Sequence, residues 1–248
     1  MKKYFFILTI AIISLFSCSK DALNRSESSS GGAGTGGSLA KFTIVGNYLY
    51  VVETATLKTF DITNAANPIL KNSLVIGSNI ETIFPYKNNL FIGSQNGMFI
   101  YNIANGETPV YEGAASHVRS CDPVIANDSI AFVTLRAGSN CGSPTDGLYV
   151  YDIKNLTAPI FLNTYGLATP YGLGLNNDRL FVCGGANGLY VLNVANPNSP
   201  VLMQTITGNN YFDVIPYNNM LICYVNDGIV LYDISNTNSI QLIKKITN

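Results

Sequence analysis

The segment YGLGLNNDRLFVCGGANGLYVLNVANPNSPVLMQTI, residues 171–206, decides the fold class. It contains four short apolar runs, and each run is bounded by Asn, Asp, Gly or Pro, the residues that favour tight turns. The two middle runs, RLFVC and GLYVLNV, are almost continuously apolar, as expected for strands that are buried on both faces of a sheet. No helical period of apolar residues is present. The segment therefore predicts a four-stranded antiparallel sheet.

The same pattern recurs along the chain. Its second strands start at equivalent positions that are 41, 40, 50 and 41 residues apart, namely Leu49, Leu90, Ile130, Leu180 and Leu221. The third strands supply a second set of anchors, Phe60, Tyr101, Tyr151, Leu192 and Tyr232. Eight residues after each of these stand Pro68, Pro109, Pro159, Pro200 and, in the fifth copy, Ile240. Three sets of anchors in phase over five copies indicate a repeat architecture.

The fourth strand of each copy differs from the others. It alternates between apolar and polar residues and carries Lys71, Glu112 or Lys244, which is typical of an exposed outer edge. Sheets that are buried on both faces and have one polar edge are the blades of β-propellers. We therefore predict an all-β fold, a five-bladed β-propeller of four-stranded antiparallel blades, over residues 41–248. Asp61, Asp152 and Asp233 are expected to cap the loop after the third strand of the first, third and fifth copies.

The first copy begins at its innermost strand and the last copy ends at its outermost strand. The ring is therefore expected to close by packing the first blade on the fifth. An open or dimerised arc is the alternative.

Composition limits the possible partners and cofactors. The chain has 248 residues, a net charge of −1 and only 12% charged residues, which argues against nucleic acid or an anionic membrane surface as the main partner. Its single histidine, His117, excludes histidine-rich metal sites. No cofactor and no metal are expected.

The N-terminus has the pattern of an export signal. A basic MKK precedes an apolar run that is too short to span a bilayer, and the run ends in LFSC at residues 15–18, which resembles a bacterial lipobox. We expect a lipoprotein signal peptide over residues 1–17 and lipidation of Cys18; an ordinary secretory signal is the alternative. Residues 18–40 are rich in Gly and Ser and are expected to form a disordered tether. The early SKD resembles a surface-export signal, so a lipid anchor in the outer membrane is expected, facing the cell surface rather than the periplasm.

The repeat has a third strand of the YDI type, an ANP-like turn and an outer strand preceded by proline. This pattern resembles the LVIVD repeat of β-propeller lipoproteins of Gram-negative bacteria. The segments RSCDPV, AFVTLRAGSNCG, YGLGL and FDVIPYNN are also similar to a lipoprotein subgroup of that family. The sequence departs from the pattern at Asn102, Asn193 and Ile240. The resemblance implies a cell-envelope propeller and no established reaction.

One loop of the third copy, residues 136–147, is enlarged and contains Cys141. Cys121 precedes the inner strand of the same blade on the same face of the ring, and exported proteins are in a disulfide-permissive compartment. A Cys121–Cys141 disulfide is therefore predicted; two free thiols are the alternative, and a zinc site that includes His117 has unsuitable spacing. Cys183 and Cys223 lie within apolar strands and are expected to be buried, with side chains on opposite faces of their sheets.

The entry to each inner strand is expected to surround the axis of the ring. Aligned across the copies, the entry positions are Ala40, Glu81, Asp122, Gly172 and Asp213. The neighbouring polar or aromatic residues are Asn79, His117, Arg119, Tyr171, Asn210 and Tyr211. We expect this axial mouth to be a candidate binding site on the face that carries the enlarged loop.

Three interpretations of the mouth remain open. The acids can hold backbone N–H groups of neighbouring turns, they can bind a polar ligand or protein segment, or they can act as the carboxylate pair of a glycosidase. The favoured hypothesis is a non-enzymatic, monomeric envelope scaffold that binds an unknown protein or glycan. A carbohydrate-active propeller, either lectin-like or a glycoside hydrolase, is the alternative.

Overall fold

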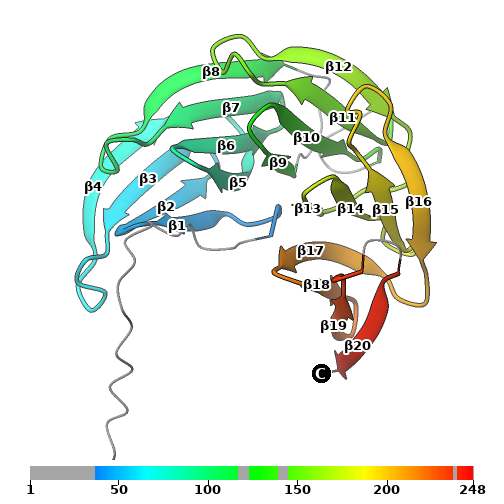
Figure 1. Cartoon of the computed structure of the whole chain (residues 1–248). Coiled ribbons are helices and arrows are strands. Elements are labelled where there is room, and N and C mark those ends of the chain that lie inside the picture. Colours follow the sequence, from blue (N-terminus) through cyan, green and yellow to red (C-terminus); the bar gives the residue numbers. More distant parts are fainter. Residues whose placement is uncertain (1–36, 117–122, 139–144, 237–238, 248) are drawn as a thin grey trace, which may run out of the picture. The chain divides into compact units, whose positions relative to one another are not determined.

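The computed structural model describes residues 37–116, 123–138, 145–236 and 239–247. These residues form five four-stranded antiparallel sheets, each made of four consecutive strands, and the sheets follow one another as the blades of a propeller (Figure 1). The predicted fold is confirmed. The described residues contain no helix long and apolar enough to cross a membrane.

Every blade is built in chain order, from an inner to an outer strand. Blade one consists of β1 (Phe42–Val45), β2 (Tyr48–Glu53), β3 (Thr56–Asp61) and β4 (Ile69–Val75). Blade two consists of β5 (Ile80–Tyr86), β6 (Asn89–Ser94), β7 (Gly97–Asn102) and β8 (Val110–Ser116). Blade three consists of β9 (Val124–Ala126), β10 (Ile130–Leu135), β11 (Gly147–Asp152) and β12 (Ile160–Tyr165).

The last two blades repeat this arrangement. Blade four consists of β13 (Leu173–Asn176), β14 (Arg179–Cys183), β15 (Leu189–Asn193) and β16 (Val201–Ile206). Blade five consists of β17 (Tyr211–Tyr217), β18 (Met220–Val225), β19 (Gly228–Asp233) and β20 (Gln241–Thr247). We call the side with the loops between second and third strands the insertion face, and the opposite side, with the tight turns between first and second strands, the turn face.

The expected difference between middle and outer strands is present. Every residue of β10 is buried, whereas most residues of β4, β16 and β20 are exposed. Each outer strand also contains one register shift against its third strand, at the same repeat position in all five blades. Bulges of this kind twist a strand away from regular pairing, so they protect an outer edge against pairing with another chain.

The loop after each third strand is capped as the sequence predicted. The side chains of Asp61, Asp152 and Asp233 each accept a hydrogen bond from the N–H group two residues later, at 2.8–2.9 Å. Asn102 and Asn193 make the same bond at 2.9 Å. The two asparagines that depart from the family pattern therefore preserve the local structure, because the amide oxygen is an equivalent acceptor.

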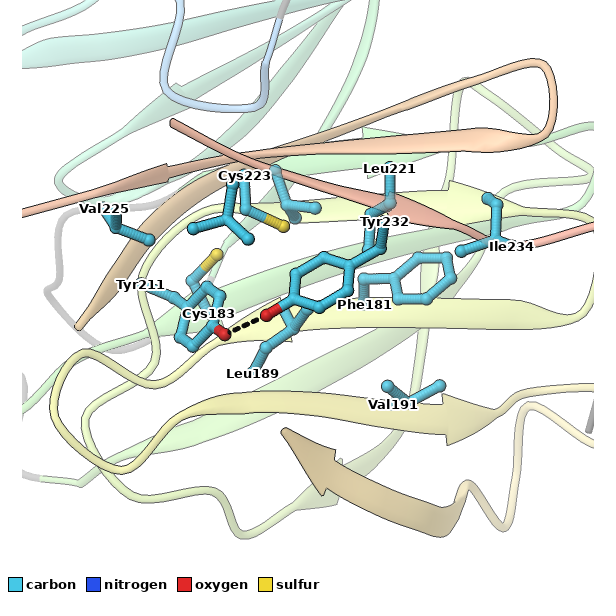
Figure 2. Packing of buried hydrophobic residues seen from close by; sticks show 12 residues of the cluster. Phe181, Cys183, Leu189, Val191, Tyr211, Leu221, Cys223, Val225, Tyr232 and Ile234 are labelled. Carbon is cyan, nitrogen blue, oxygen red and sulfur yellow. Dashed lines mark hydrogen bonds between the residues drawn. The ribbon is translucent and has the colours of Figure 1, made fainter. Parts of the chain in front are cut away.

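Apolar side chains fill the space between consecutive blades in four separate clusters. Figure 2 shows the cluster between blades four and five, which includes Phe181, Cys183, Cys223 and Tyr232. The two cysteines are fully buried, as predicted. They point to opposite faces of their own sheets, and this places both in the same interface because neighbouring blades pack face to face. Burial raises the pKa of the Cys223 thiol to about 12, so this thiol is unreactive.

The expected packing of blade one on blade five is not present in the described residues. Phe42 on β1 is 60% exposed and Tyr224 on β18 is 57% exposed, although both lie on faces that other blades bury. The prediction of ring closure was therefore wrong. Pattern alone shows that these faces are apolar, but it does not show which surface covers them.

Candidate functional site

The inner strands of blades two to five line an axial pocket of about 610 Å³ that opens on the turn face. Its walls are apolar and include Phe84, Ile125, Leu175 and Ile215. Its rim contains Tyr86, Asn127, Asn177 and Asp178, which lie at or beside the tight turns. A pocket of this size with apolar walls and a few polar groups is typical of ligand sites.

The polar groups at the rim bond to their own neighbours. The side-chain oxygen of Asn127 accepts hydrogen bonds from the N–H groups of Ser129 and Ile130, at 3.0 and 2.8 Å. Burial and a hydrogen bond to Asp128 raise the pKa of the Tyr86 hydroxyl, and Asp128 also pairs with Lys87. These contacts fix the side chains of Asn127 and Tyr86 at the rim, and the apolar walls lie beside them.

This pocket was not predicted from the sequence. Acidic residues cluster at the axial mouth on the insertion face, so the site was expected there. The apolar inner strands were interpreted only as core, and sequence patterns do not show which end of a propeller axis stays open. The residues that line the pocket have no sequence feature that predicts a binding site, apart from their position on inner strands.

The mouth on the insertion face is covered by residues 37–40. Ser38 is 1% exposed, and its hydroxyl accepts the N–H of Leu173 at 2.7 Å and donates to the Asp213 carboxylate at 3.4 Å. The carbonyl of Ala40 accepts the N–H of Ile83 at 2.9 Å. The segment therefore contacts blades two, four and five. The assignment of residues 37–40 to the flexible tether was therefore wrong. Their Gly- and Ser-rich composition suits both a free tether and a segment that packs closely against several blades.

Asp213 is the acid that this segment covers. Burial raises the pKa of its carboxyl to about 6, although N–H groups of Val214, Leu39 and Ser38 and the Ser38 hydroxyl act in the opposite direction. A side chain at Gly172 would overlap the Asp213 carboxylate and the Phe212 carbonyl. Glycine at this position is therefore required by close packing. Asp213 accepts backbone N–H groups, as one of the three interpretations of the mouth expected.

The strand register corrects the alignment of the mouth. Asp213 pairs with Tyr224 as Thr82 pairs with Gly93, so Asp213 is equivalent to Thr82 and not to Glu81. The offset arises in blade three, where Ala131, not Ile130, is paired with Tyr151. Glu81 and Asp213 therefore do not occupy matching positions around the axis.

Tyr211 was predicted to line the mouth, and this prediction was wrong. Its side chain is fully buried between blades four and five, and its hydroxyl lies 2.6 Å from that of Tyr232 (Figure 2). A register shift separates Tyr211 from Asp213, so the two side chains do not share a face as strict alternation implies.

The other described residues of the predicted mouth have separate environments. The Tyr171 ring lies 4.1 Å from the guanidinium of Arg136 and 5.2 Å from the Phe212 ring. Burial raises the pKa of Glu81, against the effects of Lys41 and Arg136. Asn79 donates to the side chain of Gln95 at 2.5 Å, and Asn210 is exposed. The remaining predicted residues, Cys18, His117, Arg119, Cys121, Asp122 and Cys141, lie outside the described residues.

The base of the enlarged loop is held by Asp146. Its carboxylate accepts the N–H of Ala137 at 2.6 Å, which joins the two ends of the loop, and the N–H of Thr169 at 3.0 Å, which joins them to the connection between blades three and four. The predicted Cys121–Cys141 disulfide falls outside the described residues. Asp146 thus holds the two ends of the loop together at its base and joins them to Thr169.

Replacing Ser38 with alanine is expected to lower the free energy of unfolding by about 1–3 kcal/mol, because the buried N–H of Leu173 loses its acceptor. Urea unfolding measures this loss. Ser199→Ala, at an exposed loop position, is the control and is expected to change stability by less than about 0.5 kcal/mol. Equal effects of the two substitutions would contradict the contact.

Comparisons with known proteins agree with the fold. The LVIVD repeat model matches residues 36–75 and 177–207. The chain is similar to the computationally designed Ika8 protein, with a TM-score of 0.61, 15% identity, and coverage of 83% of this chain and 60% of that chain. It is similar to apo AztD from Citrobacter koseri, with a TM-score of 0.59, 14% identity, and coverage of 82% and 60%.

A third similar structure is the periplasmic gluconolactonase PpgL of Pseudomonas aeruginosa, with a TM-score of 0.62, 14% identity, and coverage of 82% and 68%. The chain spans three fifths of the length of the first two structures. No curated protein matches the sequence. Identity at this level shows a shared fold and carries no function. The chain is therefore a five-bladed β-propeller that contains LVIVD repeats.

Proposed function

We propose that this propeller is a non-enzymatic binding scaffold of the cell envelope whose axial pocket receives an apolar side chain of a protein partner. The observation that carries this proposal is the 610 Å³ pocket with apolar walls on four inner strands. Rigid strands fix the walls in place, so a partner is bound without ordering a loop. A buried apolar anchor surrounded by a polar rim is the common arrangement of protein interfaces.

A protein partner fits the pocket better than a sugar does. Sugar sites present polar groups that are free to bond hydroxyls, whereas the Asn127 side-chain oxygen at the rim already accepts two backbone N–H groups. The chain also has no tryptophan to stack on a sugar ring. Catalysis is disfavoured because the Asp213 carboxylate is covered by residues 37–39 and by Gly172, which leaves little space for a substrate.

The lipid anchor belongs to the same proposal. Lipidation of Cys18 would hold the propeller at the outer membrane, on the cell surface, through the tether that follows it. Cys18→Ala is expected to move the protein from the membrane fraction to the soluble fraction. Protease added to intact cells is expected to degrade the lipidated protein; protection until the outer membrane is broken would contradict surface exposure.

Two substitutions at Leu175 test the pocket. Leu175→Trp fills it and Leu175→Asp makes it polar, and each is expected to reduce retention of the partner from envelope extract by about tenfold or more. Leu202→Trp and Leu202→Asp are matched controls on the exposed outer strand β16 and are expected to retain the partner.

Quantitative mass spectrometry of the retained proteins, together with a glycan array, reads the result. Thermal unfolding first establishes that all variants are folded. Equal retention by the Leu175 and Leu202 variants would contradict the proposal. Glycan binding that survives Leu175→Asp would favour the carbohydrate-binding alternative.

A further inference from the structure

The outward face of blade five has the residues of a blade–blade interface but no blade beyond it. Tyr224 is more than half exposed, whereas the equivalent residues of blades one, three and four, Val52, Thr134 and Cys183, are at most 2% exposed. The adjacent strand repeats the contrast. Ile229 is 39% exposed, and its equivalents Leu189, Leu148, Met98 and Leu57 are at most 1% exposed. Neighbouring residues Ile222 and Leu231 on the same face are partly buried. We call this set the trailing face of blade five.

Blade one shows the complementary surface at the other end of the series. Phe42 on β1 is more than half exposed, whereas its equivalents Ile83, Val124, Leu173 and Val214 are at most 1% exposed. Leu49 and Val51 on β2 and Phe60 on β3 share this face with Phe42. We call it the leading face of blade one. The Glu53–Lys58 pair, at 2.7 Å, lies on the same face, so its two charges balance.

The two faces belong to the types that pack together inside the chain. At each of the four internal interfaces, the trailing face of one blade packs on the leading face of the next. Exposing such a face is costly, because large apolar side chains gain free energy when they are removed from water. Contiguous apolar surface of this kind marks a site of association.

We propose that a second copy of this chain covers these faces, with the trailing face of blade five on the leading face of blade one of the other copy. The interface continues the four internal ones, and a second copy supplies the required complement without any new type of contact. The contact is head-to-tail: two copies form a closed dimer where the rotation between them lets both pairs engage, and an open series of copies where it does not. This association uses the outer ends of the blade series and does not depend on the axial pocket.

Photo-crosslinking in cells tests the contact. Benzoylphenylalanine replaces Tyr224 in the full chain, and the cells are irradiated before extraction. The expected product has twice the mass of one chain, and mass spectrometry maps it to a peptide of β1 or β2. The same probe at Tyr111, which is 57% exposed on the outer strand β8, is the matched control and is expected to give no such product.

Each other outcome overturns the proposal. A product with the mass of one chain and the same mapped peptide would mean that blade one closes on blade five within the chain. A product with a different protein would assign the faces to that protein, and the absence of a product at position 224 would leave the faces unpaired.

A substitution measures the strength of the association. Tyr224→Glu is expected to weaken dimer formation by about tenfold or more, measured by analytical ultracentrifugation of the purified full chain in detergent. Tyr111→Glu introduces the same charge at the same exposure and is expected to leave the dimer unchanged. Thermal unfolding checks that both variants fold. A wild-type chain that sediments as a monomer at every concentration would contradict the proposal.

Discussion

Replacing Phe181 with alanine is expected to lower the free energy of unfolding by about 3–5 kcal/mol, because the side chain is fully buried between blades four and five and its loss leaves a cavity there. The phenyl ring of Phe181 packs among Cys183, Leu221 and other residues of that cluster (Figure 2). Urea unfolding followed by circular dichroism measures the loss. Against a typical domain stability of about 5–15 kcal/mol, this is a large fraction.

Phe161→Ala is the matched control for Phe181. Phe161 lies on the outer strand β12 and is 52% exposed, so its loss is expected to cost less than about 1 kcal/mol. The contrast tests whether interfaces between blades, and not the outer edges, stabilise the propeller. Equal costs for the two substitutions would contradict this distribution of the core.

Replacing Asp213 with asparagine is expected to change how stability depends on pH. Burial raises the pKa of Asp213 in the folded chain to about 6, from a value of 3.8 for an exposed carboxyl. The folded state therefore binds more protons than the unfolded state between these pH values. The contribution of Asp213 to the free energy of unfolding is fully present below pH 4 and is lost as the pH rises through 6. The difference between the two pKa values corresponds to about 3 kcal/mol.

Asparagine resembles the protonated acid, so Asp213→Asn is expected to be more stable than the wild type above pH 6, by up to about 3 kcal/mol. Urea unfolding at a series of pH values between 4 and 8 measures the difference. Ser38→Ala combined with Asp213→Asn is expected to show non-additive effects, because the two side chains are in contact. A difference between wild type and Asp213→Asn that does not vary with pH would contradict the assignment.

The repeat pattern was sufficient to predict the blades. Anchors such as Leu90 and Tyr101 pair across β6 and β7, and charged residues such as Lys71 mark the outer strands, because each blade repeats the same burial. The caps at Asp61, Asp152 and Asp233 followed from local turn chemistry. These features depend on short-range pattern, which a single sequence contains.

The errors at the mouth have specific physical causes. A bulge beside Phe212 buried Tyr211, and a one-residue misalignment of blade three displaced Asp213 from the position of Glu81. Single-residue register changes reverse the direction of a side chain, and they leave little trace in a sequence. The covering of the mouth by Ser38 and its neighbours was missed because glycine-rich sequence suits both a free tether and a closely packed crossing.

The axial pocket and the interfaces between blades are built from the same inner strands. The interfaces between blades bury the apolar clusters, and residues such as Ile125 and Leu175 belong both to these interfaces and to the walls of the axial pocket. Leu175 lies at this boundary: it is only partly buried and it lines the pocket.

Photo-crosslinking at Leu175 in living cells tests the central claim most directly. Benzoylphenylalanine at this position is expected to capture one envelope protein through an apolar segment identified by mass spectrometry, whereas the same probe at Leu202 on β16 captures none. Capture of the same set of proteins at both positions, or of no protein at position 175, would contradict a binding function for the axial pocket.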